Sequence, residues 1–225
     1  LAGVVEEVGQ DVKTFKKGDE VFASCGFKFG AYAEYKCMEV NDSIALKPKN
    51  MTFEEAAAVP IGGLTALRFI QSSGLKAGDN ILIYGASGSV GTFAVQIAKA
   101  VGAHVTAVCS GSNIDLVKSL GADAVIDYTR DDFTKILSSF DVVFDAVGKT
   151  SKSACKDLLK PSGKYVTVTG SPKEGINDLV QLKELIEAGK LKSVLDRNYP
   201  LEQIREAHAY VESFRKRGNV IVNVV

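Results

Sequence analysis

The chain has 225 residues, of which 46% are hydrophobic and 24% are charged, a composition typical of a globular protein that can bury a sizeable core. Its 27 basic residues balance 27 acidic ones, so no net field favours a nucleic acid or an anionic membrane surface. No stretch approaches the roughly 20 uninterrupted apolar residues of a membrane span. We therefore expect neither a nucleic-acid partner nor a membrane.

The chain has four cysteines and only two histidines, and no two cysteines form a C-x-x-C pair. The cysteines are Cys25, Cys37, Cys109 and Cys155. Their wide spacing indicates reduced thiols in a reducing compartment and argues against a zinc site. The first residues, "LAGVVEEVG", lack the basic segment followed by an apolar one that a targeting peptide would have, but the chain begins with Leu1 rather than methionine, so the alternative is a fragment whose targeting peptide lies outside this sequence. We predict a cytoplasmic protein without a metal.

The first part of the chain predicts short strands without a helix, over residues 3–9, 16–23, 30–40 and 43–49. Thr52 followed by Glu55 is a capping box, which predicts that a helix begins at "FEEAAAVP". The character of the chain changes at that helix.

Helices and strands alternate from there on, which predicts a parallel sheet covered on both faces. The predicted strands cover residues 80–84, 104–110, 124–128, 140–148 and 163–170. The predicted helices cover residues 63–74, 90–101, 113–121 and 151–160. Two amphipathic helices, 177–191 and 201–213, and a last strand, 219–225, close the chain.

The stretch "YGASGSVG" lies between the strand 80–84 and the helix 90–101. Ala86, Gly88 and Gly91 occupy the three small positions of the dinucleotide fingerprint G-x-G-x-x-G. Gly88 would let the backbone approach a pyrophosphate, Gly91 would let the helix pack closely on the strand, and the helix N-terminus would supply amides. A tight turn without a ligand is the alternative, but the strand–turn–helix context favours a nucleotide.

The end of the next strand indicates which nucleotide binds, because an acidic residue there would bond the ribose of NAD. Cys109–Asn113 contains no carboxylate, so we expect NADP(H) rather than NAD(H). A cation would hold the 2′-phosphate better than hydroxyls alone. Lys118 and Arg130 are the candidates nearest in sequence, and each is also explained as an ordinary solvated charge.

Several motifs in the same order cover nearly the whole chain: "GDEVFA", "GAYAEY", "FEEAAAVPIGGLTALRFI", "GASGSVGTFAVQIAKAVGA", "SLGADAVIDYTRDDF" and "FDVVFDAVG". Together they resemble the zinc-independent quinone oxidoreductase (zeta-crystallin-like) branch of the medium-chain dehydrogenase/reductase superfamily. The resemblance implies an α/β fold, with a Rossmann domain of doubly wound parallel sheet at residues 61–191. A partial, β-rich GroES-like catalytic domain would comprise residues 1–60 and 192–225.

The resemblance also implies the cofactor contacts. Thr65 matches a position at the nicotinamide end, although a helix-interior threonine can instead bond its own backbone. Ser110 and Tyr128 match residues at the 2′-phosphate, although a tyrosine at a strand end is often only packing. Val147 and Gly170 lie at strand ends, where such sheets bind ligands. The residues that match the pyrophosphate turn are Ser87, Gly88, Ser89 and Val90.

The implied function is an NADPH-dependent oxidoreductase that transfers hydride to a quinone or an α,β-unsaturated carbonyl, without a metal and with no catalytic residue assigned. The alternative is a non-catalytic NADP(H)-binding redox sensor or structural protein. Two departures from the family pattern matter. Ser112 stands where many relatives have an arginine, and segments before Leu1 and after Gly170 have no counterpart here. The second missing segment would carry the sheet edge that usually pairs two subunits. A homodimer is therefore possible, but the loss of this edge argues against it.

Overall fold

The computed structural model describes residues 1–136, 139–169 and 176–224. The chain forms two compact units, one of Leu1–Leu64 with Glu174–Val225 and the other of Thr65–Lys173. The predicted domain boundaries, after residues 60 and 191, remain a prediction. The predicted boundary after residue 191 lies further along the chain than the start of the second segment of the first unit, because helix α4 (Ile176–Glu187) contacts strand β3 (Ile44–Leu46) of that unit.

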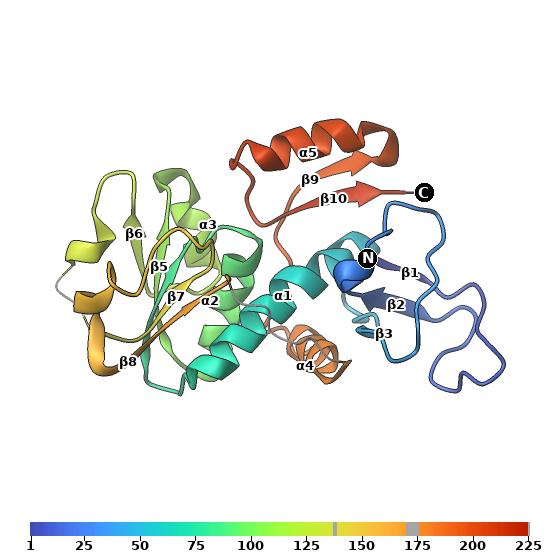
Figure 1. Ribbon diagram of the computed structural model, residues 1–225, viewed down its shortest axis with the longest axis horizontal. Coiled ribbons are helices and arrows are strands. Elements are labelled where there is room, and N and C mark those ends of the chain that lie inside the picture. The colour runs from blue at the N-terminus through green and yellow to red at the C-terminus, as the bar shows by residue number, and fades with distance from the viewer. Residues whose placement is uncertain (137–138, 170–175, 225) are drawn as a thin grey trace. The chain divides into compact units, whose positions relative to one another are not determined.

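The unit of Thr65–Lys173 is built on a five-stranded sheet of order β6-β5-β4-β7-β8, in which each neighbouring pair is parallel (Figure 1). This arrangement confirms the predicted parallel sheet. The carboxyl ends of the strands lie in one row, since Tyr84 pairs with Val108 and Asp145, and Cys109 pairs with Asp127. The strands are β4 (Asn80–Tyr84), β5 (His104–Cys109), β6 (Ala124–Asp127), β7 (Phe140–Asp145) and β8 (Leu159–Thr167).

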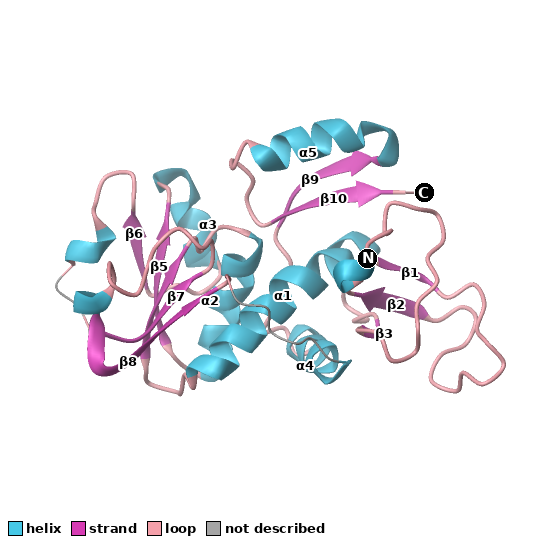
Figure 2. Cartoon of the chain, in the orientation of Figure 1, coloured by secondary structure: helices cyan, strands magenta, loops and turns pink. Residues whose placement is uncertain are grey.

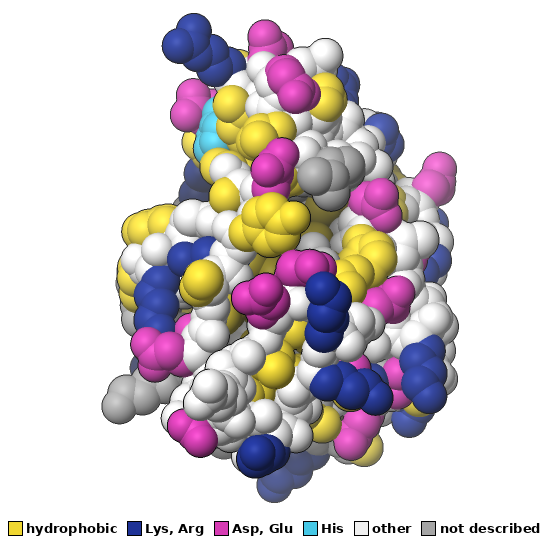
Figure 3. Space-filling view, turned by 90° about the vertical axis from the view of Figure 1, so that its right-hand side faces the viewer, with side chains coloured by type: hydrophobic (Ala, Val, Ile, Leu, Met, Phe, Trp, Pro, Cys, Tyr) yellow, Lys and Arg dark blue, Asp and Glu magenta, His cyan; other side chains and the backbone are white. Residues whose placement is uncertain are grey.

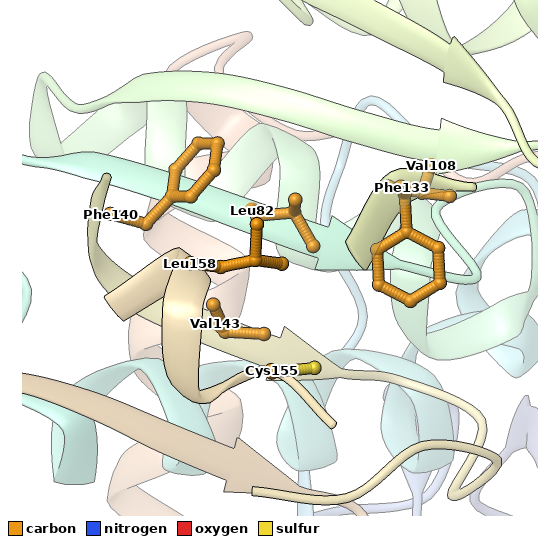
Figure 4. Close-up of a cluster of buried hydrophobic side chains, with 7 residues drawn as sticks. All are labelled: Leu82, Val108, Phe133, Phe140, Val143, Cys155 and Leu158. Carbon is orange, nitrogen blue, oxygen red and sulfur yellow. The ribbon is translucent and has the colours of Figure 1, made fainter. Parts of the chain in front are cut away.

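Both faces of this sheet are covered. One face carries Leu82, Val108 and Val143, which pack with Phe133, Phe140, Cys155 and Leu158 in one buried cluster (Figure 4). On β7 the next residue, Phe144, contacts Phe69 of helix α1 (Phe53–Ser73), with ring centroids 5.8 Å apart. Burying each such side chain contributes about 1.5–3 kcal/mol. Helix α2 (Ser89–Val101) contacts β4 and β5, and helix α3 (Ile114–Ser119) contacts β6.

Helix α1 begins as predicted at the capping box. The Thr52 amide donates to Glu55 Oε2 at 2.9 Å, and the Glu55 amide donates to Thr52 Oγ1 at 3.2 Å. The helix continues through Pro60 to Ser73, so one helix of 21 residues replaces the two predicted segments.

The predicted helix over 151–160 is wrong. Only a short 3-10 helix, η4 (Lys156–Leu158), forms there, and a second, η3 (Phe133–Lys135), follows β6. Leu159 and Lys160, the last two residues of the predicted helix, instead begin strand β8, where Leu159 pairs with Phe140 of β7. Strand pairing therefore replaces the end of the predicted helix.

The other unit contains two small sheets, and long loops connect the strands of the first sheet (Figure 2). The first sheet is antiparallel, in the order β1 (Ala2–Val4), β2 (Glu20–Ala23) and β3 (Ile44–Leu46). The second pairs β9 (Leu195–Pro200) with β10 (Asn219–Asn223) in parallel. The short helices are η1 (Gly26–Lys28), η5 (Leu201–Gln203) and α5 (Ile204–Glu212).

In this unit one predicted strand is wrong and one observed strand was not predicted. Residues 30–40 form no strand, because Gly26, Phe29 and Gly30 adopt positive φ angles and break the extended backbone before the segment begins. The side chains of Tyr32 and Tyr35 are 56% and 76% exposed and lack a buried face. Strand β9 was not predicted, because "LDRNYP" has neither an apolar run nor a regular alternation.

Candidate functional site

The turn after β4 is held by the neighbouring strand. The amides of Gly85 and Ala86 both donate to the Val108 carbonyl of β5, at 3.0 and 3.1 Å. Gly85 has a φ of 79°, a conformation that favours glycine. Gly88 then forms the N-cap of α2 without a side chain, so the first amides of α2 are not capped by their own N-cap residue. A helix start of this kind is suited to an anion.

Gly91 shows why this turn needs small residues. A Cβ at Gly91 would collide with the Gly85 carbonyl oxygen and lie 2.6 Å from Ala86 Cα. A Cβ at Gly88 would instead meet only the Gly85 carbonyl oxygen, at 3.5 Å, which is ordinary contact. Helix α2 therefore packs directly on the turn, and the space beside Gly88 is open to a ligand, as the dinucleotide fingerprint requires.

Asn113 joins this turn to the loop after β5. Its side-chain nitrogen donates to Ser87 Oγ and to Ser110 Oγ, each at 3.1 Å. Asn113 ends the short 3-10 helix η2 (Gly111–Asn113) and is only 9% exposed. Because Asn113 fills an acceptor site on both serines, their hydroxyl hydrogens can be donated elsewhere. Asn113 was predicted only as part of the loop, and its role was missed because only the fold brings Ser87 next to it.

The carboxylate of Asp127, at the end of β6, lies against the same loop. A Cβ at Gly111 would collide with Asp127 Oδ2. Hydrogen bonds from the Thr129 hydroxyl and amide, then from the Gly111 amide, lower the pKa of Asp127. No carboxylate was predicted at this loop, because Asp127 follows a different strand. An acidic group therefore does lie beside the loop predicted to hold the 2′-phosphate.

Tyr128 follows Asp127 and is 49% exposed. Its amide donates to the Cys109 carbonyl at 3.1 Å, and its ring meets the Tyr84 ring edge to face at 6.3 Å. Tyr84 also stacks on Phe133, with centroids 4.8 Å apart. The Tyr128 ring is thus anchored by packing on one side and open to solvent on the other.

The loop after β7 is organised by Asp145, which is fully buried. Its carboxylate accepts hydrogen bonds from the amides of Val147, Gly148 and Thr150 at 2.8–3.0 Å, and from the Tyr165 hydroxyl at 3.2 Å. This network places Val147 against the glycine turn, where a Cβ on Gly85 would meet Val147 Cγ1 at 2.5 Å. Burial, then the charge of Asp145, raises the pKa of Tyr165 to about 12.

The structure brings most of the predicted cofactor residues to one edge of the sheet. Ser87, Gly88, Ser89 and Val90 form the turn and the start of α2, Ser110 is tied to the turn through Asn113, and Tyr128 and Val147 flank it. Thr65 lies half-buried in α1, and the hydrogen bonds of the described residues do not join it to these loops. Gly170 lies outside the described residues.

The other predicted chemistry is modest. Lys118 and Arg130 are both exposed, and the charge of Arg130 acts on Asp127.

Across the described part of the chain, no three histidine, cysteine or acidic residues gather to hold a metal, and the absence of a metal stays a prediction. All four cysteines are free, with Cys109 and Cys155 buried, and burial raises the pKa of Cys109 to about 11. No helix among the described residues combines the length and apolarity needed to cross a bilayer.

Comparison with known families gives two matches. A family described as "Zinc-binding dehydrogenase" matches residues 89–212, and one described as "Alcohol dehydrogenase GroES-like domain" matches residues 1–49. In solved structures, the chain is similar to the quinone oxidoreductase from Coxiella burnetii, with a TM-score of 0.90 and 30% identity. That match covers 100% of this chain and 78% of the other. The predicted combination of Rossmann and GroES-like folds is confirmed.

Among curated proteins, the chain is 38% identical to 2-methylene-furan-3-one reductase of Solanum lycopersicum, over 100% of this chain and 62% of that protein. It is 37% identical to the chloroplastic NADPH-dependent alkenal/one oxidoreductase of Arabidopsis thaliana, over 99% of this chain and 62% of that protein. The chain thus spans 62% of the length of these two relatives.

The relatives overturn the predicted location. Several carry chloroplastic or mitochondrial names, which point to an organelle, so the cytoplasmic prediction was wrong. Cysteine usage could not reveal this, because free thiols are compatible with any reducing compartment. The motifs, in contrast, identified the family correctly: the chain belongs to the medium-chain dehydrogenase/reductase superfamily, in its zinc-independent quinone oxidoreductase branch.

Proposed function

We propose that this protein is an NADPH-dependent oxidoreductase that transfers hydride to a quinone or an α,β-unsaturated carbonyl. The observation that carries the proposal is the edge of the sheet where the turn after β4 and the loop after β5 meet through Asn113. Open α/β sheets bind their ligands at this edge. The names of the two curated relatives support the acceptor class, one being an alkenal/one oxidoreductase and the other a furanone reductase.

The residues at this edge suit a dinucleotide. The open space beside Gly88 and the start of α2 would hold the pyrophosphate, with Ser87 as a hydroxyl donor. Ser110 would meet the adenosine ribose end, and Val147 would line the opposite side of the turn. When bound, NADPH supplies the hydride, and the protein supplies binding and orientation.

We propose the remaining contacts on the family resemblance alone. Thr65 would face the nicotinamide end, and Gly170 would be a further cofactor contact. Residues 1–60 and 192–225 would form the catalytic domain that holds the acceptor, a small quinone or enone. Acidic and basic side chains are interspersed on the face seen in Figure 3, so this face has no basic patch of the kind that binds nucleic acid. The partner that we propose is a small-molecule substrate. A homodimer stays a prediction that gel filtration with light scattering can test.

The test is NADPH oxidation by the purified chain, with a small quinone and an α,β-unsaturated aldehyde offered in parallel. We expect turnover with at least one acceptor. Gly91→Ala should abolish it, because the added Cβ would collide with the turn. Gly3→Ala is the matched control, since a Cβ there meets no atom within 4 Å. Tight NADPH binding without turnover on either acceptor would contradict the proposal and favour a binding protein.

A further inference from the structure

The loop predicted to hold the 2′-phosphate offers that group hydroxyls and a negative charge. Ser110 and Ser112 supply hydroxyls, whose oxygens lie 3.2 Å apart. Ser112 is neutral. The Asp127 carboxylate lies directly against Gly111, the residue between Ser110 and Ser112 in the sequence. Since a 2′-phosphate carries up to two negative charges, a carboxylate at this position opposes it.

Asp127 is fixed in this place by its own turn. Its Oδ1 accepts from the Thr129 amide at 3.0 Å and from the Thr129 hydroxyl at 2.7 Å. These bonds leave Oδ2 directed at Gly111, whose amide is thereby engaged with a carboxylate. An amide engaged in this way is not available as a donor to a phosphate.

Arg130 belongs to the same turn as Asp127. The Arg130 amide donates to the Asp127 carbonyl at 3.1 Å, and the Arg130 charge acts on the Asp127 carboxylate. Two effects, the charge of Asp127 and the Gly111 amide that it engages, oppose the 2′-phosphate.

We infer that Asp127 is a specificity-determining residue, which limits the preference of this protein for NADPH over NADH by opposing the 2′-phosphate. This inference rests on the proposed function, because it assumes that the adenosine end of the cofactor lies over Ser110. It differs from the usual rule, in which the acidic residue that selects NAD ends the second strand of the fold. Here the carboxylate comes from the end of the third strand, β6, and reaches the loop from the side.

The experiment measures binding of 2′,5′-ADP and of 5′-AMP to the full chain by calorimetry, beside kcat/KM for NADPH and NADH. Asp127→Asn keeps the turn, because an amide oxygen can still accept from Thr129. We expect this variant to bind 2′,5′-ADP roughly threefold to tenfold more tightly, with 5′-AMP little changed, an effect limited by solvent screening. The ratio of kcat/KM for NADPH to that for NADH should rise by a similar factor.

Asp132→Asn is the matched control. Asp132 accepts from the Thr134 amide at 3.1 Å and from its hydroxyl at 2.6 Å, the same pattern as Asp127, and pairs with Lys135. The Asp132→Asn variant removes the same charge and should leave the affinities for 2′,5′-ADP and 5′-AMP unchanged. Equal affinities in Asp127→Asn and the parent would overturn the inference alone. Binding of neither 2′,5′-ADP nor 5′-AMP to the parent chain would overturn the proposed function and the inference together.

Discussion

The turn after β4 and the loop after β5 lie side by side but are built by different means. The turn is shaped by backbone packing, because Gly91 has no room for a Cβ and Gly85 needs a positive φ. The loop is shaped by side-chain hydrogen bonds, through Asn113 and Asp127. Shape tolerates little change, whereas a polar network can be altered one bond at a time. We therefore expect the turn at the pyrophosphate end to tolerate few substitutions, and the loop at the 2′ end to tolerate more.

Gly91→Ala tests the shape-determined side and should have the largest effect. Alanine is normally favourable in a helix by about 1 kcal/mol, so any loss arises from the collision with Gly85 and Ala86. We expect a loss of about 3 kcal/mol or more in the free energy of unfolding, measured by chemical denaturation. A Gly91→Ala variant as stable as Gly3→Ala would show that the turn can shift, and would remove the difference between the two regions.

Asn113→Ala tests the bonds that join the two regions. It removes two hydrogen bonds from a buried side chain, so NADPH binding should weaken roughly fivefold to tenfold. Cofactor fluorescence measures this, with Asn198→Ala, at an exposed position in β9, as the control. Asn113→Asp should be worse than Asn113→Ala, because a carboxylate would draw both serine hydroxyls inward. If both variants bound NADPH normally, each serine would hold its position unaided.

Ser110→Ala and Ser87→Ala separate the two ends of the cofactor and serve as controls for each other. Ser110→Ala should raise KM for NADPH by roughly threefold and leave NADH unchanged, since only NADPH has a 2′-phosphate. Ser87→Ala should affect both cofactors alike, because both contain the pyrophosphate. Identical effects of the two variants would mean that the loop after β5 does not discriminate between the cofactors.

Tyr165→Phe should have a modest effect on stability near neutral pH, a loss of about 1 kcal/mol for one hydrogen bond to Asp145, measured by denaturation. The pKa of Tyr165 is raised to about 12 from an unfolded value of 10.0, so its stabilisation is complete below pH 10.0 and is lost as the pH rises toward about 12. The variant should therefore lose stability less steeply over that interval. Tyr35→Phe, at a 76% exposed position, should keep the steep loss. An unchanged slope in Tyr165→Phe would contradict this prediction.

The sequence predicted the parts of this site that depend on local pattern. The strand, glycine turn and helix around Gly88 were correct to within a residue, because periodicity and glycine spacing both act over short distances. Asp127 was missed because its contact with Gly111 depends on which strands are neighbours, and the chain reaches β6 only after another helix. The strand predicted at 30–40 failed because the positive φ angles of Gly26, Phe29 and Gly30, which the alternation of residues does not reveal, break the extended backbone.

The burial of Cys109 has a consequence for the chemistry proposed here. Electron-poor alkenes react with thiolates, so a protein that handles enones exposes its own cysteines to alkylation. Burial raises the pKa of Cys109 to about 11 and also raises the pKa of Cys155, so both thiols stay protonated near neutral pH. Burial thus protects Cys109 and Cys155 from alkylation, whereas the exposed Cys37 thiol lacks this protection.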